Sequence, residues 1–257
     1  MKKQITVLKV GGKIVEDPQS LSDLLNRFAR ISGHKVLVHG GGRTATDLAT
    51  RMGVETKMVN GRRITDAEML RIVTMVYGGL VNKNVVAQLQ ARGINALGLT
   101  GADLGIIRSH KRPVTDIDYG FAGDIEQVNG QRLAHLIESD IVPVMAPLTC
   151  DAAGQILNTN ADTIAAETAK ALAPFFDVTL VYTFEKKGVL SNPDNDDSVI
   201  PYINAESFKK LVDDGTIQGG MIPKIHNALE AIASGVRKVV ITHTTAIDGQ
   251  QGTTIEA

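Results

Sequence analysis

Short runs rich in β-branched residues alternate along the chain with longer amphipathic runs rich in Ala and Leu. The first kind comprises residues 5–10, 35–40, 94–99, 141–148, 177–184 and 238–243. The second kind comprises residues 19–31, 43–52, 66–92, 161–173, 205–213 and 224–234. Strands that alternate with helices build a parallel sheet with helices on its faces. The chain is therefore predicted to be an α/β protein, a three-layer αβα sandwich with a mainly parallel central sheet.

Two segments interrupt this alternation. The stretch from RSHKRPVTD to FAGDIEQVNG, residues 108–130, predicts an antiparallel hairpin inserted into the parallel pattern. Pro174 follows a predicted helix and marks a seam between two lobes, residues 1–173 and 174–257.

The charge balance argues against several classes of partner. The formal net charge is −1, so the chain lacks the basic excess typical of proteins that bind nucleic acids or membrane surfaces. No apolar run in the sequence reaches the length of a transmembrane helix. The single cysteine, Cys150, cannot form an internal disulfide. We therefore expect a cytoplasmic protein that binds neither nucleic acid nor membrane.

Glycine clusters lie where predicted strands end or helices begin. They are Gly11 and Gly12, then Gly40, Gly41 and Gly42, and finally Gly219 and Gly220 ahead of Lys224. In open parallel sheets, ligands bind beyond the carboxyl ends of the strands. Glycine lets backbone N–H groups approach an anion, and a helix N-terminus adds partial positive charge. One such dipeptide is equally typical of a tight turn, but the repeated arrangement predicts a phosphate site.

The type of phosphate ligand is less certain from the residues alone. The Walker pattern is absent from the sequence, whereas GGGRTA at residues 40–45 satisfies the dinucleotide pattern G-x-G-x-x-A. The acidic residue that would hold a ribose is missing, although Arg62 or Arg63 would suit a 2′-phosphate. An NADP-linked oxidoreductase therefore stays open, as does a non-catalytic amino-acid-binding regulator.

Asn158, Asn160 and Asp162 lie at the start of a strongly predicted helix, in LNTNADTIAAETAKAL. Asn and Asp commonly cap helices by accepting hydrogen bonds from free N–H groups. Three such residues exceed the need of one cap, so some of them are expected to face a ligand.

Six motifs together resemble the N-acetyl-L-glutamate kinases, a branch of the amino-acid kinase family. They are LKVGGK, LVHGGG, NGRRIT, GFAGDIEQVN, NTNADTIAAETA and GGMIPK, in the order and spacing of that branch. The resemblance covers roughly residues 9–254. It implies the amino-acid kinase fold and ATP-dependent phosphorylation of a γ-carboxylate to an acyl phosphate, in arginine biosynthesis.

The implied reaction needs no catalytic base, because a carboxylate is already ionised at neutral pH. It needs in-line positioning and neutralisation of charge on the moving phosphoryl group. Lys9 and Lys224 match the family's two lysines at that group, and Asp162 matches the carboxylate that orients them. Glycine N–H groups of residues 11, 12 and 41 would complete the cradle.

The resemblance also implies the substrate contacts. Arg63 matches the guanidinium that binds the α-carboxylate, and Asn158, Gly41 and Gly42 match the remaining contacts. The implied ligands are an N-acyl-L-glutamate, acetyl by default, and ATP with Mg²⁺ held largely by phosphates and water. Lobe 1–173 would bind the acyl-glutamate and dimerise, and lobe 174–257 would bind the nucleotide.

Residues 183–189, TFEKKGV, depart from the family's usual T-D-V-x-G-V pattern. Phe184 stands where an aspartate is expected, and the loop is one residue longer. The nucleotide-binding candidates are Gly11, Gly12, Glu185, Lys187, Gly188 and Gly220, with Lys186 as a further possibility.

A second departure is Arg62, which occupies a position where an apolar residue is common. With Arg108, Lys111 and Arg112 in the inserted hairpin, it would suit an acyl group with its own carboxylate, such as succinyl. Arginine-inhibited members of the family carry an extra N-terminal helix that links dimers into hexamers. The first predicted strand begins by about residue 5, so we expect an arginine-insensitive homodimer.

Overall fold

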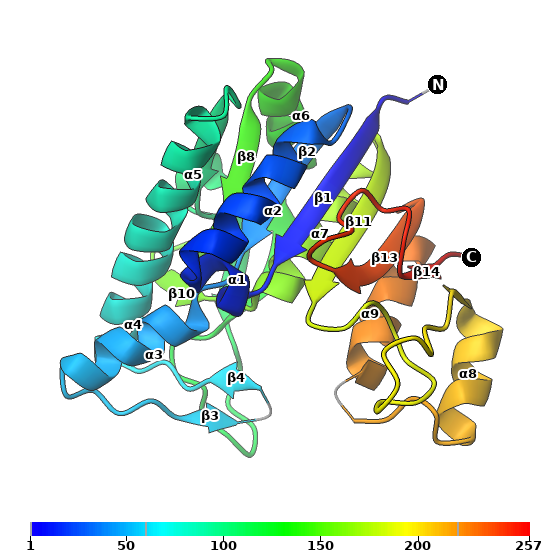
Figure 1. The fold of residues 1–257 in the computed structure, drawn as a ribbon. Helices are drawn as coiled ribbons and strands as arrows, with labels where there is room; N and C mark the ends of the chain where they lie inside the picture. Colours follow the sequence, from blue (N-terminus) through cyan, green and yellow to red (C-terminus); the bar gives the residue numbers. More distant parts are fainter. Residues whose placement is uncertain (1, 60, 220) are drawn as a thin grey trace.

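The computed structural model describes residues 2–59, 61–219 and 221–257. Its main feature is an eight-stranded sheet with the order β12-β14-β13-β11-β1-β2-β8-β5 (Figure 1). Five neighbouring pairs, from β13 across to β5, are parallel, whereas β14 runs antiparallel to β13. The strands are β1 (Gln4–Val10), β2 (His34–His39), β5 (Ala96–Leu99), β8 (Val142–Met145), β11 (Asp177–Phe184), β12 (Tyr202–Ile203), β13 (Lys238–His243) and β14 (Thr253–Ile255).

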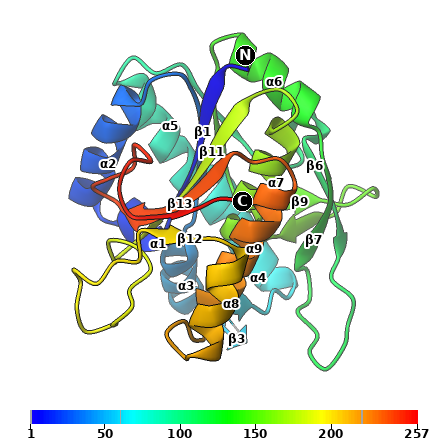
Figure 2. The same ribbon diagram turned by 90° about the vertical axis from the view of Figure 1, so that its right-hand side faces the viewer.

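Helices cover both faces of this sheet, as Figure 2 shows in a view turned by 90°. One layer holds α1 (Gly12–Glu16), α2 (Pro18–Arg30), α3 (Gly42–Arg51), α4 (Ala67–Val73), a π-helix (Thr74–Val81) and α5 (Asn82–Gln90). The other holds α6 (Gly130–Glu138), α7 (Ala161–Leu172) and α9 (Met221–Ala233), with α8 (Ala205–Asp213) beside α9. The predicted three-layer αβα sandwich is confirmed.

The alternation of side chains along each strand divides the core into two clusters. In β1, Val7 packs with the cluster on the α6–α7–α9 side, whereas Leu8 packs with the cluster on the α2–α5 side. In β2, Val36 and Leu37 divide in the same way. Successive side chains of a strand point to opposite faces, so a strand covered on both faces is apolar throughout. This explains why the predicted strands read as continuous apolar runs.

The inserted hairpin is also present, within a second sheet of order β10-β9-β6-β7. Its strands are β6 (Ile107–Lys111), β7 (Gly123–Val128), β9 (Leu148–Cys150) and β10 (Ile156–Asn158), and β6 pairs antiparallel with β7. A small ribbon of β3 (Met58–Val59) and β4 (Arg62–Arg63) lies near α3 and α4 in Figure 1. Single bridges join Thr65 to Gly120 and Ala122 to Asn158, so the hairpin is fastened next to β4 and β10.

Three elements differ from the predictions. The helix predicted over 66–92 consists of α4, the π-helix and α5 in succession. The strand predicted over 141–148 is divided, because β8 ends at Met145 in the main sheet and β9 begins at Leu148 in the second. The sequence reading also missed α6, although Asn129 accepts a hydrogen bond from the Arg132 N–H at its start. A 3₁₀ turn (Asp103–Gly105) precedes β6.

The two predicted lobes share the main sheet. Strand β1 pairs in parallel with β11 from Gln4↔Asp177 to Lys9↔Tyr182, across the seam at Pro174.

Among the residues that the structure describes, no helix has both the length and the apolar composition needed to cross a membrane.

Candidate active site

The first two glycine turns lie against each other at the carboxyl ends of β1 and β2. These strands are parallel neighbours, with Val10 opposite His39. A Cβ atom added to Gly40 would lie 3.0 Å from the Gly12 nitrogen, and one added to Gly12 would lie 3.5 Å from the nitrogens of Gly41 and Gly42. Gly41 has a φ of +156°, and a Cβ there would lie 3.1 Å from the Tyr77 ring. The structure thus gathers Gly11, Gly12, Gly41 and Gly42 in one place, as predicted.

His39 supports these turns from inside the core. Its Nδ1–H donates to the Gly40 carbonyl at 2.7 Å, and its Nε2 faces the Asn82 amide nitrogen at 3.1 Å. A carbonyl oxygen only accepts, so the proton must lie on Nδ1 and Nε2 must accept. Burial lowers the pKa of His39 to about 4, which keeps the ring neutral at pH 7. His39 is therefore a structural support of the glycine turn.

Lys9 and Asp162 form an ion pair beside the glycine turns. The Lys9 ammonium lies 2.8 Å from the Asp162 Oδ1, and both side chains are largely buried. The side chain of Asn160 accepts from the backbone N–H groups of Asp162 at 2.7 Å and Thr163 at 3.3 Å. Because Asn160 caps α7, the Asp162 carboxylate is left to bind Lys9. The Tyr182 hydroxyl donates to the Asp162 carbonyl at 3.2 Å and fixes this turn of α7 from β11.

Lys224, in the first turn of α9, reaches the same place from the other side. Its ammonium lies 4.0 Å from the centroid of the Phe184 ring, and the Lys9 ammonium lies 6.0 Å from that centroid. Burial lowers the pKa of Lys224, the nearby Asp162 raises it, and the like charge of Lys9 lowers it again. Two ammonium groups and one carboxylate therefore meet around an aromatic ring.

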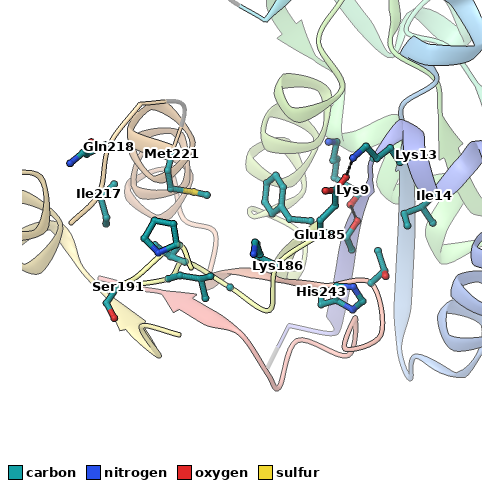
Figure 3. A pocket seen from close by; sticks show the side chains of 18 of the residues that line it. Lys9, Lys13, Ile14, Glu185, Lys186, Ser191, Ile217, Gln218, Met221 and His243 are labelled. Atoms are coloured by element: carbon teal, nitrogen blue, oxygen red, sulfur yellow. Dashed lines mark hydrogen bonds and ion pairs between the residues drawn. The ribbon is translucent and has the colours of Figure 1, made fainter. Parts of the chain in front are cut away.

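A cavity of about 820 Å³ opens beside Lys9 and Phe184 (Figure 3). Lys9, Lys13 and Ile14 line it from the β1–α1 side, and Ile217, Gln218 and Met221 line it from the α9 side. The β11 end and the following loop contribute Phe184, Glu185, Lys186 and Gly188. Lys13 and Glu185, both of which line the cavity, form an exposed ion pair.

Not every predicted nucleotide contact lines this cavity. Lys187 is exposed and lies 2.6 Å from Asp197, outside the set of lining residues. A Cβ atom at Gly188 would lie 2.8 Å from the Thr253 hydroxyl, so this glycine is required by close packing against β14. Gly220 lies outside the described residues.

A second, smaller cavity of about 210 Å³ lies beyond the glycine turns. Its lining includes Gly41, Gly42, Arg62, Arg63 and Asn158. Arg63 is 8% exposed and donates to the Gly42 carbonyl at 2.7 Å and to the Thr46 and Thr56 hydroxyls at 2.9 and 3.2 Å. The Asn158 amide donates to the Thr65 hydroxyl at 2.9 Å. The predicted substrate contacts therefore share one cavity.

Arg62 interacts with other groups than the adjacent Arg63 does. The Arg112 guanidinium donates through two of its nitrogens to both carboxylate oxygens of Asp124. Among residues 2–59, 61–219 and 221–257, Arg62 forms no ion pair. Burial and the charge of Arg112 lower the pKa of Arg62, whereas the charge of Asp124 offsets part of this effect. A half-buried guanidinium that forms no ion pair within the described residues thus lines the smaller cavity.

Comparison with known proteins connects this geometry to a family. The profile of the amino acid kinase family matches residues 4–243. Acetylglutamate kinase from Bacteroides thetaiotaomicron is 66% identical over 256 residues and covers 100% of both chains. The solved structure of smu.665 from Streptococcus mutans UA159 has a TM-score of 0.79 at 29% identity and covers 98% of both chains. The carbamate kinase of Giardia lamblia shares the fold, with a TM-score of 0.68 at 15% identity over 99% of this chain and 98% of its own. From the profile match and the relatives that span its whole length, the chain belongs to the amino acid kinase family.

Proposed function

We propose that this protein phosphorylates the γ-carboxylate of an N-acyl-L-glutamate with ATP, giving an acyl phosphate and ADP in arginine biosynthesis. N-acetyl-L-glutamate is the default substrate, because full-length relatives at 66% and 65% identity are acetylglutamate kinases. The observation that carries the proposal is the ion pair of Lys9 and Asp162, because it lies between the two cavities. Lys9 lines the larger cavity, and Asp162 is the next residue in sequence after Ala161, which lines the smaller one.

The chain's own residues supply positioning and charge. The substrate carboxylate attacks the γ-phosphorus as an ionised nucleophile, so no general base is needed. Lys9 and Lys224 offset negative charge on the phosphoryl group during transfer, and Asp162 holds Lys9 in place. N–H groups of Gly11, Gly12 and Gly41 aim at the phosphate oxygens from the turns that meet between the strands.

The acyl-glutamate occupies the smaller cavity in this proposal. Arg63 binds the α-carboxylate through its charge and its Nε–H, since its terminal N–H groups are fixed by the Gly42 carbonyl, two threonine hydroxyls and the Met69 sulfur. Asn158 and the N–H groups of Gly41 and Gly42 bind the rest of the substrate. All lining residues of this cavity fall between positions 40 and 161, which supports lobe 1–173 as the acyl-glutamate lobe.

ATP occupies the larger cavity, whose volume of about 820 Å³ suits a nucleotide. Its lining comes from positions 9–14 and 183–244, so lobe 174–257 supplies most of the nucleotide contacts, Glu185 and Lys186 among them. The described residues contain no group of three or more His, Cys, Asp or Glu side chains able to cage a metal ion. In this proposal Mg²⁺ binds mainly to the ATP phosphates and water, where it would offset phosphate charge.

The test is ADP release from ATP with a panel of N-acyl-L-glutamates and free L-glutamate. Release that depends on an N-acyl-L-glutamate is the expected result, with hydroxylamine trapping the acyl phosphate. Binding of NADPH with enhanced fluorescence would instead favour an oxidoreductase. ATP binding without turnover on any member of the panel would indicate a non-catalytic regulator.

We predict that N-succinyl-L-glutamate is accepted beside the acetyl compound and that Arg62 is responsible. A carboxylate on the acyl group would compensate the unpaired Arg62 in the wall of the cavity. Arg62→Ala should lower kcat/KM for the succinyl substrate by at least about tenfold, the order of effect expected when a charged group loses its buried partner. The acetyl substrate should stay within about twofold. Exclusive use of the acetyl compound by the unaltered enzyme would contradict the prediction.

We also predict a homodimer that arginine does not inhibit. Met75 is 50% exposed and Leu80 61% exposed on the π-helix. Residues five apart are joined by a backbone hydrogen bond in a π-helix, so these two side chains lie on one face. Light scattering should give the mass of two 27.5 kDa chains, and Leu80→Glu should shift it toward one. A mass of six chains, or inhibition by millimolar arginine, would contradict this prediction.

A further inference from the structure

Phe184 lies between the two lysines that the proposed reaction uses. It is the last residue of β11, opposite His243 of β13, and it lines the larger cavity. The Lys224 ammonium lies 4.0 Å from the ring centroid and the Lys9 ammonium 6.0 Å from it. The ring of Tyr182 lies 6.5 Å behind, centroid to centroid, on the same face of β11. The aromatic ring thus has a fixed position on the sheet.

The two lysines have different partners. Lys9 is paired with the Asp162 carboxylate at 2.8 Å. Within the described part of the chain, Lys224 forms no ion pair, and its ammonium lies over the face of Phe184. The face of an aromatic ring carries negative charge density and attracts an ammonium within about 6 Å of the centroid. The ring therefore offers Lys224 an attraction that a neighbouring carboxylate would otherwise supply.

This difference has a chemical consequence. A carboxylate in direct contact with Lys224 would offset its charge and would repel the phosphates of ATP, whereas Asp162 is paired with Lys9 and acts on Lys224 from a longer distance. An aromatic face attracts the ammonium but carries no net charge, so the full positive charge stays available to an anion. The Asp162 carboxylate then attracts both ammonium groups, and the face of the Phe184 ring offsets part of the repulsion between them.

We propose that Phe184 is a positioning residue for phosphoryl transfer, which holds the Lys224 ammonium at the phosphoryl position through the face of its ring. The inference rests on the proposed kinase function. It explains why an aromatic residue is compatible with chemistry at a position where related kinases usually carry an aspartate.

The experiment replaces Phe184 by phenylalanine analogues with one, two and three ring fluorines. Each fluorine weakens the negative face while the ring volume stays nearly constant. We expect kcat to fall steadily along the series, roughly three- to thirtyfold in total, the range of cation–π contacts. KM for the acyl-glutamate and the melting temperature should remain unchanged. Phe184→Tyr should retain activity, and Phe184→Leu should lose as much as the trifluoro analogue.

The matched control places the same analogues at Phe175, which is 42% exposed and lies outside both cavities. Activity there should not change. A second readout needs no turnover: in ¹³C-labelled protein, the Lys224 Hε protons should show an upfield ring-current shift that disappears in Phe184→Leu. Lys224→Arg identifies the signal.

These readouts separate the two proposals. An active wild-type enzyme with a kcat that is constant along the fluorine series would overturn the role of Phe184 and leave the kinase function intact. A missing ring-current shift would also overturn it. A wild-type protein that shows the shift but phosphorylates no N-acyl-L-glutamate would contradict the kinase function and, with it, the positioning role.

Discussion

Lys9→Ala and Lys224→Ala are each expected to lower kcat by about 10²- to 10³-fold, the loss typical when one donor to a developing charge is removed. Both ammonium groups lie within 6.0 Å of the centroid of Phe184, and Phe184 and Lys9 line the larger cavity. In the proposed reaction the two ammonium groups act mainly on charge that develops during transfer, so KM for the acyl-glutamate should change far less than kcat. Steady-state ADP release at saturating ATP measures both constants.

Lys209→Ala is the control for this pair, because Lys209 is an exposed lysine on α8 that lines neither cavity. It should retain the wild-type kcat. Circular dichroism should show that all three variants are folded. Turnover near the wild-type rate in Lys9→Ala or Lys224→Ala would remove that lysine from the mechanism.

Asp162→Asn is expected to lower kcat on the order of 10²-fold, the loss that follows when a reacting group is misplaced by about 1 Å. Asparagine keeps the shape of the side chain but removes the charge that holds Lys9 at 2.8 Å. The two ammonium groups would then repel each other without a compensating anion. The measurement is kcat beside the free energy of unfolding.

Asn160→Ala gives the comparison, because Asn160 is the residue that caps α7. It should lower the free energy of unfolding by about 1 kcal/mol, the usual contribution of a helix cap. Asp162→Asn should lower it less. If Asp162→Asn reduced only the melting temperature and left kcat intact, its carboxylate would be part of the cap and not of the reaction.

The sheet and its two helical layers were predictable because buried parallel strands leave a strong signal. Val7 and Leu8 face opposite layers, so neither position of β1 tolerates a polar side chain. The second sheet was harder to predict. Its strands β9 and β10 have three residues each and pair with the inserted hairpin, which local periodicity does not reveal.

The candidate site shows a similar division. In the structure, Lys9 lines the larger cavity, Arg63 lines the smaller one and Asp162 pairs with Lys9. The motifs could indicate these residues because each of them sits near the end or the start of a regular element. The loop after β11 contains no regular element that would predict the direction of its side chains. Lys186 and Lys187 are adjacent in sequence, yet only Lys186 lines the cavity. The loop is one residue longer than the family pattern, and an inserted residue changes which side chains face the cavity. The contact of Lys224 with Phe184 joins residues from two elements and leaves no trace in either motif.

The position of β1 in the middle of the main sheet affects how the chain is made. Its two neighbours are β2, which follows within a few dozen residues, and β11, whose Thr183 hydroxyl donates to the Lys9 carbonyl across 174 positions of sequence. During synthesis on the ribosome, one edge of β1 stays unpaired until β11 has emerged. An apolar strand with a free edge is prone to pair with other chains. We therefore expect the nascent protein to depend on chaperones until β11, which ends at Phe184, has left the ribosome.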